Sequence, residues 1–164
     1  YITVRDAIGH LQPIEAGEIC INDSLHRSSA LSEINMERIR QSVPGGTWRD
    51  WDENLKLRCH RKASGATFPS VYGRMEWDRP SPTMTTQFYG YGNGRFGHPE
   101  QDRAISLREG AILQSFPEDY IFADEQHPVK KRELGTHIGN AVPVELGRAI
   151  GISIQEHLKK MEVN

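Results

Sequence analysis

The thiols and imidazoles are the first side chains in this sequence that could do chemistry. Cys59 and His60 are adjacent, and His98 is the next histidine along the chain, so together they offer ligands for zinc. A structural zinc site needs four ligands at recognised spacings, and the other cysteine, Cys20, lies far upstream. We therefore predict no metal site. No arrangement of Ser, His and Asp stands out as a hydrolytic triad. Two cysteines are also too few for a disulfide framework and fit a reducing cytoplasm.

A glycine-rich stretch, Gly90-Tyr-Gly-Asn-Gly94, has the spacing of a nucleotide-binding loop. Such a loop needs a buried strand before it and a helix after it. Here Arg95-Phe-Gly-His-Pro99 follows, which is typical of a turn. We interpret the stretch as a flexible loop.

The charges are unevenly distributed along the chain. Residues 1–53 carry five Lys/Arg against nine Asp/Glu, and residues 104–164 carry seven against nine. Residues 54–103 carry eight Lys/Arg against four Asp/Glu. A basic middle is typical of a region that faces DNA, although a solvated loop region explains the charge alone equally well.

The elements that would position these residues follow from capping signals and periodicity. Helix-start signals stand near Thr3, Ser32, Ser106 and Pro143. We expect strands at 71–77 and 83–88, where side-chain types alternate, and a loop over 12–30. The last helix carries an apolar stripe at Leu146, Ile150, Ile154, Leu158 and Met161. No apolar run approaches the ~20 residues of a membrane span, so we expect no membrane partner.

The run 103–122 begins with a capping box formed by Ser106 and Glu109 and ends its helix at Pro117. Its pattern, Arg-x-Ile-Ser-Leu-Arg-Glu-x-Ala-x-Leu-Gln-Ser-Phe-Pro-Glu-x-Tyr, resembles the ninth conserved motif of DNA (cytosine-5) methyltransferases. Downstream, Gly139-Asn-Ala-Val-Pro143 resembles the tenth motif. Both occur in the family's order. The resemblance implies that Arg103 and Arg108 are structural, because the ninth motif mainly supports the target-recognition region.

The resemblance also implies a reaction. Such enzymes bind S-adenosylmethionine on a Rossmann-like domain, flip the target cytosine out of the duplex, and attack it with a cysteine that follows proline. Cys20 follows Ile19 and Cys59 follows Arg58, so neither matches, and we predict no catalytic residue here. Glu53-Asn-Leu resembles the family's Glu-Asn-Val, but it lies downstream of that motif's place, so we interpret it as coincidence.

The resemblance assigns candidate sites residue by residue. Gly139, Asn140, Ala141 and Val142 would complete the S-adenosylmethionine pocket. DNA contacts need cations for phosphates and polar side chains for base edges. The DNA-binding candidates are Arg58, Arg61, Lys62, Arg74, Thr85, Gln87, Tyr91, Asn93 and Arg95.

We therefore expect an α+β C-terminal portion of a cytoplasmic DNA cytosine-5 methyltransferase, cut from a longer chain that begins before Tyr1. Residues 1–53 would be the end of the large-domain region, 54–102 a small, irregular, β-rich recognition subdomain, and 103–164 the two motifs and a helix returning to the α/β Rossmann-like domain. The expected partners are double-stranded DNA and the N-terminal catalytic portion, with self-association if that portion is absent. Two alternatives stay open: a stand-alone, non-catalytic DNA-binding module, and the small subunit of a split methyltransferase.

Overall fold

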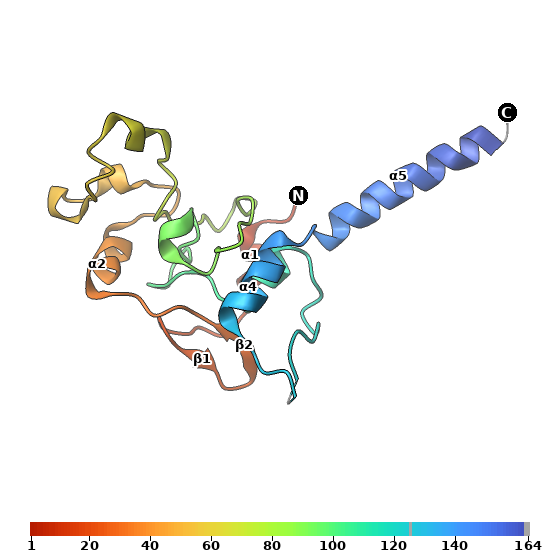
Figure 1. Ribbon diagram of the computed structural model, residues 1–164, viewed down its shortest axis with the longest axis horizontal. Helices are drawn as coiled ribbons and strands as arrows, with labels where there is room; N and C mark the ends of the chain where they lie inside the picture. Colours follow the sequence, from red (N-terminus) through yellow and green to blue (C-terminus); the bar gives the residue numbers. More distant parts are fainter. Residues whose placement is uncertain (125, 163–164) are drawn as a thin grey trace.

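The short helix α3 (Leu107–Leu113) lies at the centre of the fold and contacts α1 (Val4–Ile8), strand β2 (Asp23–Arg27) and α4 (Lys131–Asn140). The computed structural model describes residues 1–124 and 126–162. Figure 1 shows a small α+β body from which one long helix projects. The remaining elements are β1 (Ile19–Cys20), α2 (Glu33–Gln41), α5 (Val144–Glu162) and the 3₁₀ turns η1 (Trp48–Asp50), η2 (Glu53–Leu55), η3 (Ala63–Thr67) and η4 (Tyr91–Asn93).

The capping signals of α1 and α3 are confirmed. The hydroxyl of Thr3 accepts from the backbone N–H of Asp6, whose carboxylate accepts from the N–H of Thr3. Ser106 and Glu109 make the same reciprocal pair at the start of α3. Each box satisfies two N–H groups that have no partner inside the helix, so these short helices begin where the sequence predicts.

The main core gathers around α3. Leu107 and Ala111 of α3 pack with Val4 and Ile8 of α1, and the same cluster takes Phe88 from a loop. Two smaller clusters lie beyond it, one around Ile39 of α2 and one that contains Trp48, Trp51 and Leu55. Both tryptophans are buried.

The prediction of a β-rich recognition subdomain is wrong for the described residues. The one sheet of this part of the chain is the antiparallel pair β1–β2, inside the 12–30 segment that we expected to be a loop. At 71–77 the chain makes only isolated bridges at Arg74. Tyr72 takes a left-handed backbone conformation (φ 60°) that no continuous strand accommodates. At 83–88 the chain turns, with the N–H of Phe88 donating to the carbonyl of Thr85.

Helix α5 does not fold back on the body (Figure 1). Every residue of 144–161 is exposed, including the apolar stripe. The predicted helix is confirmed, whereas packing of its stripe against this chain is not seen in the described residues. Helix α4 was not expected from the sequence.

Candidate functional site

The segment that follows α2 is basic and aromatic, and it contains Trp48, Trp51 and His60. Trp48 stacks on His60 with ring centroids 4.3 Å apart, and Trp51 lies at an angle to the same imidazole. The N–H of Leu57 donates to Nδ1 of His60, while Nε2 is buried without a partner among the described residues. Burial, followed by the nearby Arg38 cation, lowers the pKa of His60. The stacked imidazole thus packs the loop that carries it against the tryptophans. No local sequence pattern predicts this contact.

Three of the predicted DNA-binding side chains lie on that loop and are exposed: Arg58, Arg61 and Lys62. Arg61 also donates to the backbone carbonyl of Glu53 at 2.6 Å, which orders the loop from within. The three cations thus form one solvent-facing group, which we call the basic loop.

A second exposed group comprises the turn before the glycine-rich loop and Asn93 of that loop. Thr85, Gln87 and Asn93 are exposed, and Nδ2 of Asn93 donates to the backbone carbonyl of Gln87 at 3.2 Å. These polar side chains face solvent while the next residue, Phe88, is buried in the main core. We call residues 85–87 the polar turn.

Two other candidates, Arg74 and Tyr91, are buried. Arg74 is 4% exposed, and its guanidinium donates to the backbone carbonyls of Ile39, Ser42, His98 and Gln101. It is also paired with the carboxylate of Asp102. Because its donors are satisfied inside the fold, the predicted DNA contact is not supported for Arg74.

Tyr91 is buried with its hydroxyl 2.8 Å from the hydroxyl of Ser42. Burial raises the pKa of Tyr91 to about 12. A DNA contact is therefore not supported for this side chain either. Arg95 is half-buried and donates to the carbonyl of Gly46 at 2.7 Å, so part of its guanidinium is already engaged.

Beneath α3 lies a buried ion pair. The guanidinium of Arg103 donates to both carboxylate oxygens of Glu109 at 2.7 Å, and each residue is 1% exposed. Burial alone would raise the pKa of Glu109, but the bidentate Arg103 and the N–H of Ser106 hold it below its ordinary value. The expectation that Arg103 is structural is confirmed. Arg108 is likewise structural, because it pairs with Asp23 on β2 at 2.6 Å.

His98 completes this buried network. Its Nδ1 accepts from the backbone N–H groups of Glu100 and Gln101. Burial lowers the pKa of His98 to about 4, although the Glu109 carboxylate acts in the opposite direction. The side chain is therefore neutral at ordinary pH and serves as a buried acceptor. Among the described residues, no three His, Cys, Asp or Glu side chains gather to hold a metal ion.

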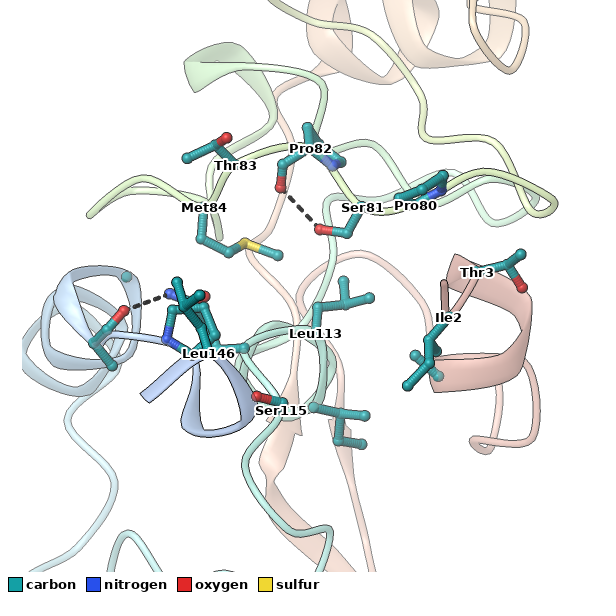
Figure 2. Close-up of a pocket in the computed structure, with 16 residues that line it drawn as sticks. Ile2, Thr3, Pro80, Ser81, Pro82, Thr83, Met84, Leu113, Ser115 and Leu146 are labelled. Atoms are coloured by element: carbon teal, nitrogen blue, oxygen red, sulfur yellow. Dashed lines mark hydrogen bonds between the residues drawn. The ribbon is translucent and has the colours of Figure 1, made fainter. Parts of the chain in front are cut away.

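A cavity of about 520 Å³ lies between the N-terminal end, the segment 80–84, the end of α3 and the junction of α4 and α5 (Figure 2). Gly139 and Ala141, two of the predicted cofactor residues, line it, and Leu113, Ser115 and Leu146 lie around the same space.

The predicted cofactor segment is held by Gln114. Its Nε2 donates to the carbonyls of Ile138 and Ala141, both at 3.1 Å. Gly139 and Asn140 are the last residues of α4, and Val142 follows in the link to α5. The structure thus places Gly139–Val142 at a helix junction, with Gly139 and Ala141 on the cavity wall and the side chains of Asn140 and Val142 exposed. No helix in the described part of the chain is both long and apolar enough to cross a membrane.

Comparison with known proteins identifies the family. The family model described as C-5 cytosine-specific DNA methylase matches residues 6–156. The chain is 58% identical over 159 residues to the type II methylase M.HgiDII of Herpetosiphon aurantiacus, covering 97% of this chain and 45% of that protein. It is 35% identical over 182 residues to DNA (cytosine-5)-methyltransferase 3 of Arabidopsis thaliana, covering 96% of this chain and 13% of that protein. It is also 35% identical over 120 residues to the type II methyltransferase M.Eco47II of Escherichia coli, covering 72% of this chain and 27% of that protein. The chain spans less than half the length of these relatives and belongs to the C-5 cytosine-specific DNA methylase family.

Proposed function

We propose that this chain supplies the DNA-recognition part and one wall of the cofactor pocket of a DNA cytosine-5 methyltransferase. The observation that carries the proposal is the family match over residues 6–156, combined with coverage of less than half of each relative. The remaining length in those relatives leaves room for a catalytic domain that is Rossmann-like in our proposal. The division at 53/54 and 102/103 is kept as part of the same proposal.

DNA binding is assigned to the two exposed groups. The cations of the basic loop suit phosphate oxygens, which fix a protein on the duplex without reading its sequence. The polar turn, with Thr85, Gln87 and the adjoining Asn93, suits base edges, because amide and hydroxyl groups both donate and accept. The exposure of both groups supports this assignment. Arg95 is a secondary phosphate candidate.

S-adenosylmethionine is assigned to the junction of α4 and α5. Gly139 and Ala141 line an open cavity, and the exposed Asn140 amide between them in sequence makes no hydrogen bond within the described part of the chain. A free amide beside a short backbone segment fits one side of a small polar ligand. When bound, S-adenosylmethionine supplies the methyl group. The residues of this chain would orient it, with Gln114 holding the wall in place.

The nucleophile is assigned to a segment outside these residues. Cys20 is buried in the β1–β2 region and Cys59 lies on the basic loop, and neither follows proline. In the proposed reaction an upstream cysteine attacks a cytosine that has been flipped out of the duplex. The role of this chain is to hold the DNA while that step occurs.

The partner proposed for α5 is the catalytic portion. Its apolar side chains are about half exposed, from 43% at Val144 to 63% at Met161. Exposed apolar stripes of this kind mark protein contacts. Covering by the catalytic portion would bury the stripe, whereas the chain alone would hide it only by self-association.

Methyl transfer tests the proposal. The full-length protein should transfer labelled methyl groups from S-adenosylmethionine to cytosine in duplex DNA, and residues 1–164 alone should not. Cys59→Ser in the full-length protein serves as a control and should keep the activity. Methyl transfer by residues 1–164 alone would show that the nucleophile has been assigned to the wrong segment, and an inactive full-length protein would contradict the proposed reaction.

A further inference from the structure

Three glycines lie where the polar turn meets the helices beneath it. Phe88 and Tyr89 follow the polar turn directly and anchor it in the core. A Cβ atom on Gly110 of α3 would lie 2.1 Å from Cε2 of Phe88. A Cβ atom on Gly135 of α4 would lie 2.3 Å from Cε1 of Tyr89. The rings of Phe88 and Tyr89 therefore occupy the space that a side chain at Gly110 or Gly135 would need.

Gly139 makes the closest approach to the polar turn itself. A Cβ atom there would lie 2.2 Å from the carbonyl oxygen of Thr85 and 2.8 Å from Cα of Thr86. Gly135 and Gly139 are four residues apart on α4, so they share one face of the helix. The neighbours of Gly139 are backbone atoms, which no change of side-chain rotamer can move away.

The helix that carries these glycines is itself fixed. Gln114 at the end of α3 holds the last turn of α4 through two carbonyls. On the other side, the hydroxyl of Ser29 donates to the carbonyl of Tyr89 at 2.7 Å, and Nζ of Lys131 lies 3.3 Å from that hydroxyl. Helix α4, which contacts the polar turn, is therefore held at its last turn by Gln114 and linked at its start, through Lys131 and Ser29, to the backbone of Tyr89.

We propose that Gly135 and Gly139 are positioning residues for DNA recognition, which let α4 lie directly against the backbone that presents Thr85 and Gln87. This inference rests on the proposed function. One face of the last turn of α4 supports the DNA-reading turn, while Gly139 and the residues that follow it also form the proposed cofactor wall. Gly139 thereby sets the position of the DNA-reading backbone relative to the cofactor site, and its own contact is with protein.

The test uses the full-length protein with Gly139→Ala and Gly135→Ala. The matched control is His137→Ala, which changes an exposed residue of the same helix. Dissociation constants are measured separately for a duplex that contains the recognition sequence, by fluorescence anisotropy, and for S-adenosylmethionine, by calorimetry. The added methyl group must displace the polar turn, so each glycine variant should bind DNA about tenfold more weakly or worse, which corresponds to losing one good base contact. Affinity for S-adenosylmethionine should stay at the wild-type value in Gly135→Ala, and His137→Ala should change neither constant. Gly139 also lines the proposed cofactor cavity, so its variant is judged on DNA affinity.

A second pair of variants covers the case in which a glycine variant does not fold. Tyr89→Leu removes the ring atoms that approach Gly135 and frees the anchor, so it should weaken DNA binding by itself. Added to Gly135→Ala, it removes the clash and should restore folding and part of the DNA affinity. No side-chain truncation can relieve Gly139→Ala, because its neighbours are backbone atoms.

Each remaining outcome has a distinct meaning. Wild-type DNA affinity in both folded glycine variants would overturn the inference, and so would an unchanged DNA affinity in Tyr89→Leu. A Gly139→Ala variant that lost S-adenosylmethionine affinity and kept wild-type DNA affinity would limit the role of Gly139 to the cofactor cavity and also overturn the inference. If the wild-type protein neither binds the duplex nor transfers methyl groups, the proposed function fails instead, and the wild-type measurement alone reveals this.

Discussion

Replacing Arg103 by Met should destabilise the chain severely, although Arg103 contacts no ligand in our proposal. The guanidinium makes two charge-assisted hydrogen bonds to Glu109, both at 2.7 Å, in a site where each partner is 1% exposed. After the change, the carboxylate keeps the N–H of Ser106 at 2.6 Å but loses its counter-charge. Breaking a buried pair from one side costs about 3–5 kcal/mol, because the remaining charge is left uncompensated. Such a loss is a large part of a total stability of about 5–15 kcal/mol.

The double variant Arg103→Met/Glu109→Leu separates the buried charge from the simple loss of contacts. With both charges gone, the desolvation cost disappears, and a well-packed apolar replacement of a buried pair is often neutral. The double variant still loses the carboxylate half of the capping box on α3, worth about 1 kcal/mol. It should therefore be more stable than Arg103→Met by about 2 kcal/mol or more.

Urea unfolding followed by tryptophan fluorescence measures both variants, since Trp48, Trp51 and Trp77 report on the body of the chain. Unfolding is compared at pH 7, where the Glu109 carboxylate is ionised because its pKa lies below the ordinary value. A loss below about 1 kcal/mol for Arg103→Met would refute the reasoning, since exposed ion pairs contribute that much. A double variant less stable than the single one would also refute it.

Three further predictions concern pH, DNA and assembly. Burial lowers the pKa of His98 from its ordinary value of 6.5 to about 4. The stability that the neutral imidazole contributes is therefore complete above about pH 6.5 and is lost as the pH falls toward 4, by up to about 3 kcal/mol. His98→Asn should flatten this part of a stability–pH curve. Lys62→Ala in the full-length protein should lower the slope of log K for DNA binding against log salt by about 0.9, the value for one phosphate contact, in a titration at several salt concentrations. Ile150→Glu should leave the unfolding of the body of this chain unchanged, because α5 lies outside it. In the proposed assembly, the same change should weaken co-sedimentation of this chain with the separately expressed catalytic portion.

The sequence predicted best those elements whose signals are local. The capping boxes of α1 and α3 involve residues three apart, and both form as predicted. The apolar stripe of α5 predicted a long helix, which the structure also has. Helix α4 was missed because Gly135 and Gly139 lower its intrinsic helix propensity, and no side chain caps its start at Lys130. Both glycines are explained by contacts with residues about fifty positions away along the chain.

The candidate DNA residues show the same division. Charge alone cannot separate Lys62, which is exposed, from Arg74, which is buried among backbone carbonyls. The acceptors of Arg74 lie at sequence separations of 24 to 35 residues, so only the folded chain reveals them.

The alternation of side-chain types at 71–77 predicted a strand that does not form, for a related reason. The left-handed backbone of Tyr72 interrupts the segment, and Gly73, Arg74 and Met75 are all buried in succession.

Two features of this chain depart from the usual polarity of an isolated domain. Arg74, Arg103 and Glu109 are buried, while the apolar side chains of α5 face solvent. Charges buried in pairs cost desolvation but fix geometry, since each pair has a single arrangement in which all its hydrogen bonds form. The exposed stripe, in turn, needs a partner surface to be stable in water. This combination fits our proposal, in which the body holds a DNA-reading turn in place while α5 joins it to the catalytic portion. A free chain that showed neither self-association nor binding of a hydrophobic dye would contradict the second half of this reasoning and leave the first half intact.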